Sequence, residues 1–333
     1  MPMRIEKGMK ISLVLVLVLS ITISKGQRIS KYVYVPELVG GWWNITSNPE
    51  LGIYTSPKQQ PVDFGVWQAA DGTWQLWSCI RGTKAGGFTR LFYRWEAKSL
   101  RDTNWMPKGI AMEADTSLGE AKSGLQAPFV FKENKTYYMF YGDWNHICMA
   151  RSTDGKHFER ILNSDHSASI FYGPMGNTRD PMVLKTGKTF YCYYSAHLEK
   201  NDPTIQIKTA VFCRKSKDLK TWSEPAMVSG GGTAVQHTGW YGGDAECPFV
   251  VKIKKKYILF RNQNYGKDNF NTQYSSSDPM NFGVGNDLFK VGELSIAAPE
   301  IIKIKNQYYI VALKPELNGM RVAKLKFVKR RSR

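Results

Sequence analysis

The sequence contains few cysteines, few acidic residues and no long apolar run after its first 26 residues. The five cysteines follow neither a disulfide framework nor a metal-ligand spacing, which argues against a disulfide-stapled scaffold and a zinc module. They are Cys79, Cys148, Cys192, Cys213 and Cys247. The odd number leaves at least one thiol free, and a bond between Cys192 and Cys213 on neighbouring strands stays open. Neither a long amphipathic helix nor an internal linker is present, so a second domain is not expected.

The first 26 residues have the pattern of an export signal. Basic residues at positions 4, 7 and 10 precede the apolar run Ile11–Ile23, and Ser24-Lys25-Gly26 offers the small residues that a signal peptidase requires. We expect cleavage near Gly26 and a secreted or periplasmic protein beginning at Gln27. The run is shorter than the roughly 20 residues of a membrane-spanning helix, so a stable membrane anchor is not expected; a retained anchor is the alternative.

Acidic residues number 28 against 46 Lys and Arg, which gives a formal charge of +18. Removing residues 1–26 takes away four basic residues and one acidic residue and leaves +15. Such an excess favours anionic partners, which for an exported protein means acidic or sulfated glycans or a membrane surface. A solvated basic face is the alternative. Nucleic acid is not an expected partner, because the chain contains no nucleic-acid-binding motif.

A strand–turn–strand pattern occurs five times along the chain. Each copy begins with a small or acidic residue and an anchor, followed by apolar residues, a polar turn and a second apolar strand. The anchors are Phe64, Pro128, Pro181, Pro248 and Pro299, spaced by 64, 53, 67 and 51 residues. A supersecondary unit recurring at roughly 40–50 residues or a little more is typical of a propeller blade. The sequence therefore predicts an all-β, single-domain, five-bladed β-propeller.

A second motif repeats out of phase with the anchors. A Ser/Asp turn followed by an aromatic residue comes after the third expected strand of three blades, ending at Phe158, Trp222 and Phe282. The polar side chains can bond the turn backbone, and we expect the aromatic ring to pack under the blade. The predicted organisation is a signal peptide at 1–26, a lead-in at 27–61, the propeller at 62–328 and a basic tail at 329–333.

The anchors predict which side chains meet on the propeller axis. The innermost strand of each blade lines a central funnel, so residues at the entrance of these strands converge although they are far apart in sequence. Five blades deliver, in order, Asp63; Gln126; Arg179 and Asp180; Glu246; and Glu300. Clustered carboxylates repel one another and raise at least one pKa, which suits acid–base chemistry. The alternative is that these acids cap turns or pair with Arg179 and Arg261.

These motifs resemble those of the five-bladed propeller glycosidases of glycoside hydrolase family 43 and the related family 32. Those families place an Asp in blade one, an Asp-Pro in blade three and a Glu two residues before a Pro in blade four. Asp63, the Arg-Asp-Pro at 179–181 and the Glu-Cys-Pro at 246–248 match these positions. The last two are worded as in family 32, but the blade-one Trp-Met-Asn-Asp-Pro-Asn signature of that family is absent, which favours family 43.

The resemblance implies a role for each carboxyl group. Glu246 would be the general acid, Asp63 the base that activates water, and Asp180 the residue that holds the acid and tunes its proton. Family-43 chemistry inverts the anomeric centre, whereas in family 32 Asp63 would be a nucleophile and the configuration would be retained. A carboxyl separation of roughly 5–5.5 Å implies retention and roughly 6.5–9.5 Å implies inversion.

Gln126 and Glu300 of the funnel are candidates for substrate binding, and so are several further residues. Arg179 and Arg261 can bond sugar hydroxyls, a carboxylate or a sulfate, or can instead pair with a funnel acid. Trp144 and His146 follow the second strand of blade two, where Trp144 can stack on a sugar and His146 can bond it or instead have a structural role. Trp43 can form part of a sugar-stacking wall or of a hydrophobic plug. No metal-ligand cluster is visible, so no cofactor is expected, although relatives can hold an ion in the central channel.

The sequence thus predicts an exported glycoside hydrolase that removes a terminal furanose or xylose-like sugar from a plant or algal polysaccharide, by inversion. The substrate would be an oligo- or polysaccharide that can be anionic. Alternatives from other classes are a glycan-binding propeller without catalysis, a retaining fructan-cleaving-type hydrolase, and a phosphorylase or lyase that uses the same funnel.

Overall fold

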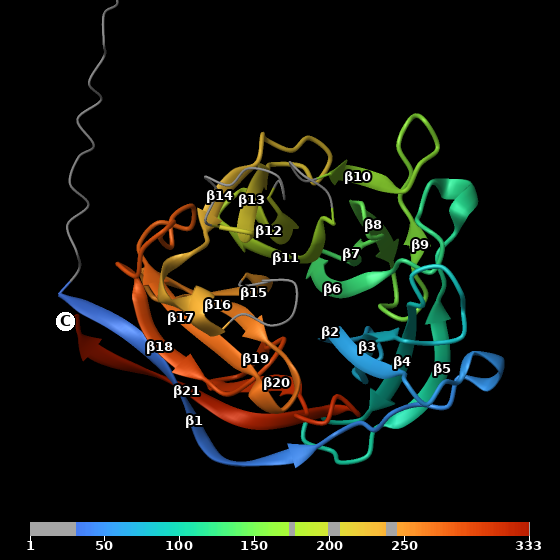
Figure 1. Ribbon diagram of the computed structural model, residues 1–333, viewed down its shortest axis with the longest axis horizontal. Coiled ribbons are helices and arrows are strands. Elements are labelled where there is room, and N and C mark those ends of the chain that lie inside the picture. The colour runs from blue at the N-terminus through green and yellow to red at the C-terminus, as the bar shows by residue number, and fades with distance from the viewer. Residues whose placement is uncertain (1–30, 173–176, 199–206, 238–244, 333) are drawn as a thin grey trace, which may run out of the picture.

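The computed structural model describes residues 31–172, 177–198, 207–237 and 245–332. The expected signal peptide and its cleavage site lie outside these residues. In the part of the chain that is described, five antiparallel sheets surround one central axis (Figure 1), which confirms the all-β, five-bladed propeller. Within the same residues, no helix has the length and apolar character that crossing a membrane requires.

Four consecutive strands build each of blades one, three and four, and five strands build blade two; in each of these blades the first strand is the innermost. Blade one contains β2 (Gln60–Gln68), β3 (Trp74–Arg81), β4 (Leu91–Ala97) and β5 (Met106–Met112). Blade two contains β6 (Gln126–Glu133), β7 (Thr136–Gly142), β8 (His146–Ser152), β9 (Glu159–Arg160) and β10 (Ser169–Tyr172). Blade three contains β11 (Arg179–Thr186), β12 (Thr189–His197), β13 (Thr209–Ser216) and β14 (Ala226–Ser229). Blade four contains β15 (Glu246–Ile253), β16 (Lys256–Asn264), β17 (Phe270–Ser276) and β18 (Lys290–Leu294).

Blade five combines the two ends of the described chain. Its inner strands are β19 (Glu300–Ile304), β20 (Gln307–Leu313) and β21 (Met320–Arg331), and its outermost strand is β1 (Tyr32–Asn44). Figure 1 shows β1 running beside β21 along the outer edge of the molecule. Short 3-10 helices lie in the connections, at Gly52–Tyr54, Thr116–Leu118, Gly232–His237 and Gly266–Asp268.

The pairing of β1 with β21 differs from the expected lead-in and basic tail. β1 lies within the expected lead-in, and the basic residues 329–331 belong to β21, where Tyr32 pairs with Arg331 and Leu38 with Leu325. The physical reason is that the last blade would otherwise expose the edge of β21. A strand from the other end of the chain covers that edge and closes the ring.

Each inner strand is distorted at the same place. The residue before each anchor has a positive φ: 35° at Asp63, 42° at Ala127, 57° at Asp180, 42° at Cys247 and 47° at Ala298. In blades one to four the strand register shifts across this residue, as in a β-bulge. We call these five residues the axial ring, because together with the anchors they line a cavity on the propeller axis.

The repeated Ser/Asp turns join neighbouring blades. Ser152 Oγ donates to Asp154 Oδ1 at 2.8 Å, and Ser216 Oγ donates to Asp218 Oδ1 at 3.0 Å in the next blade. The aromatic residue after each turn then packs on the preceding blade, in edge-to-face contacts that are favourable between rings. Phe158 contacts Trp67 and Trp77, Trp222 contacts Phe140, and Phe282 contacts Tyr193. The expected packing of these rings is therefore confirmed, and it lies between blades.

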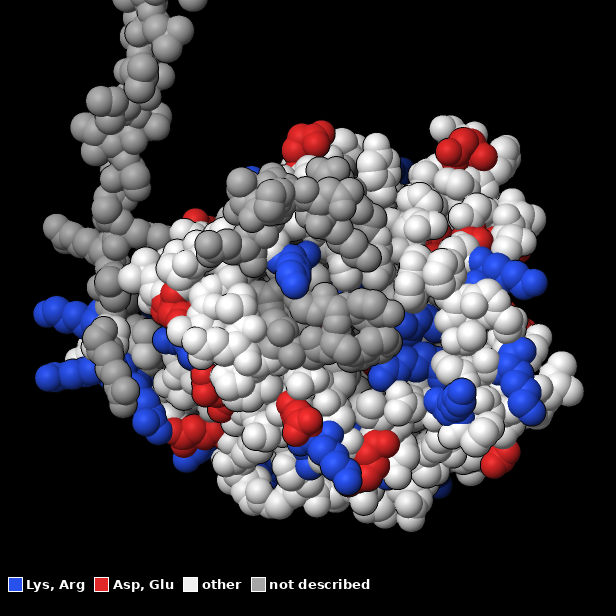
Figure 2. Space-filling view, viewed as in Figure 1, with Lys and Arg blue, Asp and Glu red and all other residues white. Residues whose placement is uncertain are grey.

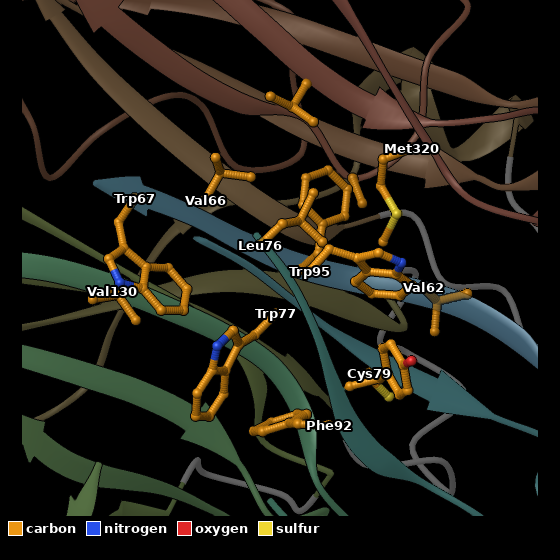
Figure 3. Close-up of a cluster of buried hydrophobic side chains, with 14 of the residues drawn as sticks. Val62, Val66, Trp67, Leu76, Trp77, Cys79, Phe92, Trp95, Val130 and Met320 are labelled. Carbon is orange, nitrogen blue, oxygen red and sulfur yellow. The ribbon is translucent and has the colours of Figure 1, made fainter. Parts of the chain in front are cut away.

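Large apolar side chains fill the space between the sheets. Figure 3 shows one such cluster, in which Trp67, Trp77 and Trp95 of blade one lie with Val130 of β6 and Met320 of β21. Trp95 and Leu76 are essentially inaccessible to solvent. This cluster joins blades one, two and five, so the ring is held together by packing as well as by β1.

All five cysteines are free thiols, and four of them are buried. The bond left open between Cys192 and Cys213 does not form. Cys192 lies opposite Arg214, and Cys213 lies opposite Tyr193. The two thiols are thus one position out of register and point to opposite faces of the sheet.

The axial ring predicts an unusual response to glycine. At Ala298 the loss of a buried methyl group is offset by relief of the left-handed conformation, which costs an alanine about 1–2 kcal/mol. Ala298→Gly should therefore change the free energy of unfolding by less than about 0.5 kcal/mol. Ala312→Gly, at an equally buried position in ordinary strand β20, should destabilise by about 1–2 kcal/mol. Urea unfolding of both variants checks this, and equal losses would contradict the strain at Ala298.

Candidate functional site

The axial cavity lies where the five inner strands begin. It is lined by the axial ring, the five anchors, Met182 and Glu300. Asp63 and Asp180 occupy bulge positions, whereas Glu246 stands one residue earlier, at the position that Arg179 takes in blade three. The residue of blade four with a positive φ is therefore Cys247. Its thiol stands at the position where blades one and three carry a carboxyl group.

Asp63 is held by two donors from blade four. Tyr265, in the loop after β16, donates its hydroxyl to Asp63 Oδ1 at 3.0 Å, and the Cys247 thiol donates to the same oxygen at 3.2 Å. The Cys247 sulfur and the Tyr265 hydroxyl also lie 3.0 Å apart. Burial and the nearby Asp63 charge raise the pKa of Tyr265 well above its usual range, so the phenol keeps its proton. Within the described residues, no hydrogen bond reaches Oδ2 of Asp63.

Asp180 and Glu246 share one guanidinium group. Arg179 is buried; its Nη2 donates to Glu246 Oε1 at 2.8 Å, and its Nε lies 3.7 Å from Asp180 Oδ2. Its Nη1 donates to the Asn177 carbonyl at 2.9 Å, which fixes the plane of the group. The backbone N–H of Cys247 donates to Asp180 Oδ2 at 3.0 Å. Arg179 therefore links the two carboxyl groups that the sequence assigns to the acid and to its partner.

Asp180 binds a proton more tightly than an ordinary aspartate. Its side chain is almost fully buried, and burial together with the charge of Asp63 raises the pKa of Asp180 to about 7. Arg179 and the Cys247 N–H act in the opposite direction and do not cancel these effects. At neutral pH Asp180 is therefore present in both its protonated and its ionised form.

Glu300 is the fifth blade's carboxyl group at the axial cavity. It lines the same cavity from the start of β19, on the side of the strand that alternation from Ala298 predicts. Burial raises the pKa of Glu300 well above its usual range. No side chain in the described part of the chain forms a salt bridge with it.

The structure separates the other expected binding residues into two groups. Gln126 is buried beside Arg179, across Gly142, and its Oε1 has no partner within the described residues. Arg261 lies elsewhere, fully buried in β16, where it donates to Ser229 Oγ and to the Gly231 carbonyl and stacks on Tyr274. Trp43 lies on outermost strand β1 against Tyr309. Arg261 and Trp43 are thus held within the blades, away from the axial cavity.

Trp144 and His146 flank the turn after β7. The indole of Trp144 is stacked on Phe88, with ring centroids 4.1 Å apart, so one of its faces is already covered. His146 Nδ1 lies 3.0 Å from Asp143 Oδ2, and this hydrogen bond raises the pKa of His146. In the stacked pair of Phe88 and Trp144, Phe88 is 40% exposed and is the more accessible ring.

Sequence reasoning missed three residues of the site. Cys247 stands inside the Glu-Cys-Pro motif and could have been found by aligning the residue before each anchor. Tyr265 and Arg90 lie in loops that follow no repeat, so no pattern indicated them. The Arg90 guanidinium lies 3.7 Å from Cys79 Sγ, and Cys79 pairs with Val62, the residue before Asp63.

Three potential metal ligands gather on the axis. One oxygen each of Asp63 and Asp180 and the sulfur of Cys247 lie within 4.8 Å of one another. These atoms could hold one cation, although Asp63 and Cys247 already hydrogen-bond to each other. The sequence did not predict a metal site here.

The raised pKa of Asp180 predicts a pH-dependent stability. A carboxyl group whose folded-state pKa is above its unfolded-state value contributes stability below about pH 4, and this contribution is lost as pH rises to about 7. Asp180→Asn does not titrate, so its free energy of unfolding relative to the native protein should increase across this window, by at most about 4 kcal/mol. Urea unfolding at pH 4 to 8 measures this. Exposed Asp268→Asn is the control, and a pH-independent difference for Asp180→Asn would contradict the raised pKa.

Comparison with known proteins supports the fold. No family model and no curated protein matches the sequence. Among solved structures, a thermostable family-43 glycoside hydrolase is 19% identical with a TM-score of 0.62, over 85% of this chain and 92% of that one. An endo-arabinase from Bacteroides thetaiotaomicron is 14% identical with a TM-score of 0.58, over 86% and 99%.

A third similar structure was determined with a sugar ligand. It is a family-43 β-xylosidase/α-arabinofuranosidase from a compost microbial metagenome, in complex with xylotriose. It is 14% identical with a TM-score of 0.56, over 84% of this chain and 95% of that one. At these identities the likeness concerns the fold: the chain is a five-bladed β-propeller of the kind found in family-43 glycoside hydrolases.

Proposed function

We propose that this protein is an exported glycoside hydrolase that removes a terminal furanose or xylose-like sugar from a plant or algal polysaccharide. One observation supports the proposal: Asp63, Asp180 and Glu246, from blades one, three and four, are linked through contacts with Cys247 and Arg179. The similar solved structures include arabinanases and a xylosidase, which supports this class of substrate.

In this proposal Asp63 is the base. Both donors found among the described residues bind Oδ1, so the carboxylate is oriented while Oδ2, without a partner there, can take a proton from water. A base must lie within hydrogen-bonding reach of that proton, and a fixed carboxylate meets this requirement without reorganisation. The reaction would invert the anomeric centre, because water attacks the sugar directly.

Glu246 is the acid, which gives a proton to the leaving oxygen of the scissile bond. Its Oε1 accepts from Arg179, so Oε2 is the oxygen left to face the substrate among the described contacts. Asp180 supports this step as a positioning residue. It is partly protonated at neutral pH and contacts the same guanidinium as Glu246, so its protonation changes the charge that Glu246 experiences.

Glu246→Gln tests the acid. The amide retains the shape of the side chain and cannot donate an acidic proton, so turnover of oligosaccharides should fall about 10²- to 10⁴-fold. Product release from arabino- and xylo-oligosaccharides and from aryl glycosides measures this, with circular dichroism to confirm folding. Glu293→Gln on outer strand β18 is the matched control and should be unaffected. Normal turnover by Glu246→Gln on any good substrate would remove Glu246 from the mechanism.

Tyr265→Phe tests how Asp63 is held. The variant removes one hydrogen bond to the ionised carboxylate, so kcat should fall about tenfold and the acidic limb of the pH–rate profile should move to higher pH. KM should change little, because the phenol points at Asp63. Tyr308→Phe, on β20 of blade five, is the control. A loss of activity without a shift of the acidic limb would mean that Tyr265 acts through packing alone.

The stereochemistry has its own readout. Proton NMR of the first sugar released distinguishes an inverted from a retained anomeric configuration. Inversion is the expected result; retention would make Asp63 a nucleophile and would return the mechanism to the fructan-cleaving type.

A further inference from the structure

Beside the axial cavity, two aromatic rings and one arginine form a compact group. Phe88 and Trp144 are stacked with an interplanar angle of 16°, and Cζ of Arg90 lies 5.1 Å from the centroid of Trp144. Phe88 and Arg90 come from the connection between β3 and β4 of blade one, whereas Trp144 follows β7 of blade two. We call Phe88, Arg90 and Trp144 the rim group.

The backbone holds this group firmly. The N–H groups of Phe88 and Arg90 donate to the carbonyls of Lys122 and Ser123, at 3.0 and 2.9 Å. At Gly87, whose φ is 49°, an added Cβ would lie 2.2 Å from the Lys122 carbonyl oxygen. The segments around Gly87 and Lys122 are therefore in close contact at a point where only glycine fits. The backbone that carries Phe88 and Arg90 is fixed by this contact.

The guanidinium of Arg90 is poorly matched by its protein neighbours. Its Nε is buried without a hydrogen-bond partner in the described part of the chain, and Nη1 has only the weak acceptor Cys79 Sγ at 3.7 Å. No salt bridge within the described residues includes Arg90. A guanidinium has five donors in a planar fork, so most of the donors of Arg90 are unused by these residues.

The surroundings of the rim group are basic. Lys84 and Lys122 are exposed on the same two segments, and neither forms a salt bridge with a described residue. Figure 2 shows Lys and Arg side chains gathered over the region where Figure 1 places β2, β3 and β4. Without these cations, the carboxyl groups of the cavity would repel any negatively charged sugar.

We propose that the rim group is a subsite for an anionic sugar of the polysaccharide, whose ring lies on Phe88 and whose carboxylate or sulfate is bound by Arg90. A planar fork of donors matches both oxyanions, and an exposed aromatic face suits a sugar ring. The subsite rests on the proposed function for its substrate class, since it adds a charged neighbour to the sugar that is removed. Binding at the rim group itself does not require cleavage.

The test compares charged sugars with neutral copies of themselves. Glucuronic-acid-substituted xylo-oligosaccharides are paired with their carboxyl methyl esters, and sulfated galacto-oligosaccharides with their desulfated forms. Binding to Glu246→Gln protein is measured by calorimetry, so that cleavage does not interfere. The charged member of at least one pair should bind about 10- to 100-fold more tightly, and Arg90→Gln should remove this preference. The pair that responds identifies the oxyanion.

Two further variants keep the result decisive. Arg151→Gln, which removes an exposed arginine from β8 in the same blade as Trp144, should leave the preference intact. Phe88→Ala should weaken both members of a pair equally, and it remains informative if Arg90→Gln fails to fold. Equal affinity for charged and neutral members in both pairs, or a preference that survives Arg90→Gln, would overturn the subsite.

The outcome is separable from that of the proposed function. Hydrolysis of neutral oligosaccharides without any preference for charge would reject the subsite and keep the hydrolase. Charge-selective binding that depends on Arg90, in a protein that cleaves none of the panel, would keep the subsite and reject the hydrolase.

Discussion

The site depends on one backbone constraint, the left-handed residue that precedes the anchor of each blade. A non-glycine residue at positive φ costs of the order of 1–3 kcal/mol, and this chain accepts that cost at all five positions of the axial ring. These five side chains line the axial cavity, so the local backbone geometry decides what the cavity contains. Small or acidic residues occupy every one of these positions, and a larger apolar side chain at any of them would compete for the same limited space.

The carboxyl groups of the site have partners of two kinds, one cationic and the others neutral. Arg179 joins Asp180 to Glu246. Neutral donors, the Cys247 thiol and the Tyr265 hydroxyl, are used where Asp63 is fixed. A cation there would neutralise the base, whereas a neutral donor orients it and leaves its charge available to the reaction.

The closing of the ring gives these contacts their precision. β1 covers the edge of β21, and the aromatic residues after the Ser/Asp turns pack each blade on its neighbour. Contacts such as that between Tyr265 and Asp63 span 202 residues of sequence, so they exist only when all blades keep their places. The order of the site therefore depends on the stability of the ring.

The sequence by itself determined the number of blades, their inner strands and the convergence of Asp63, Asp180 and Glu246, because anchors and strand alternation are local patterns that repeat. It also indicated the packing of Phe158, Trp222 and Phe282. Only the tertiary structure decided that β1 completes blade five, that Arg261 and Trp43 lie away from the axis, and that Tyr265 reaches Asp63. These three features depend on contacts between segments that are far apart in the sequence, and no local sequence pattern encodes such contacts.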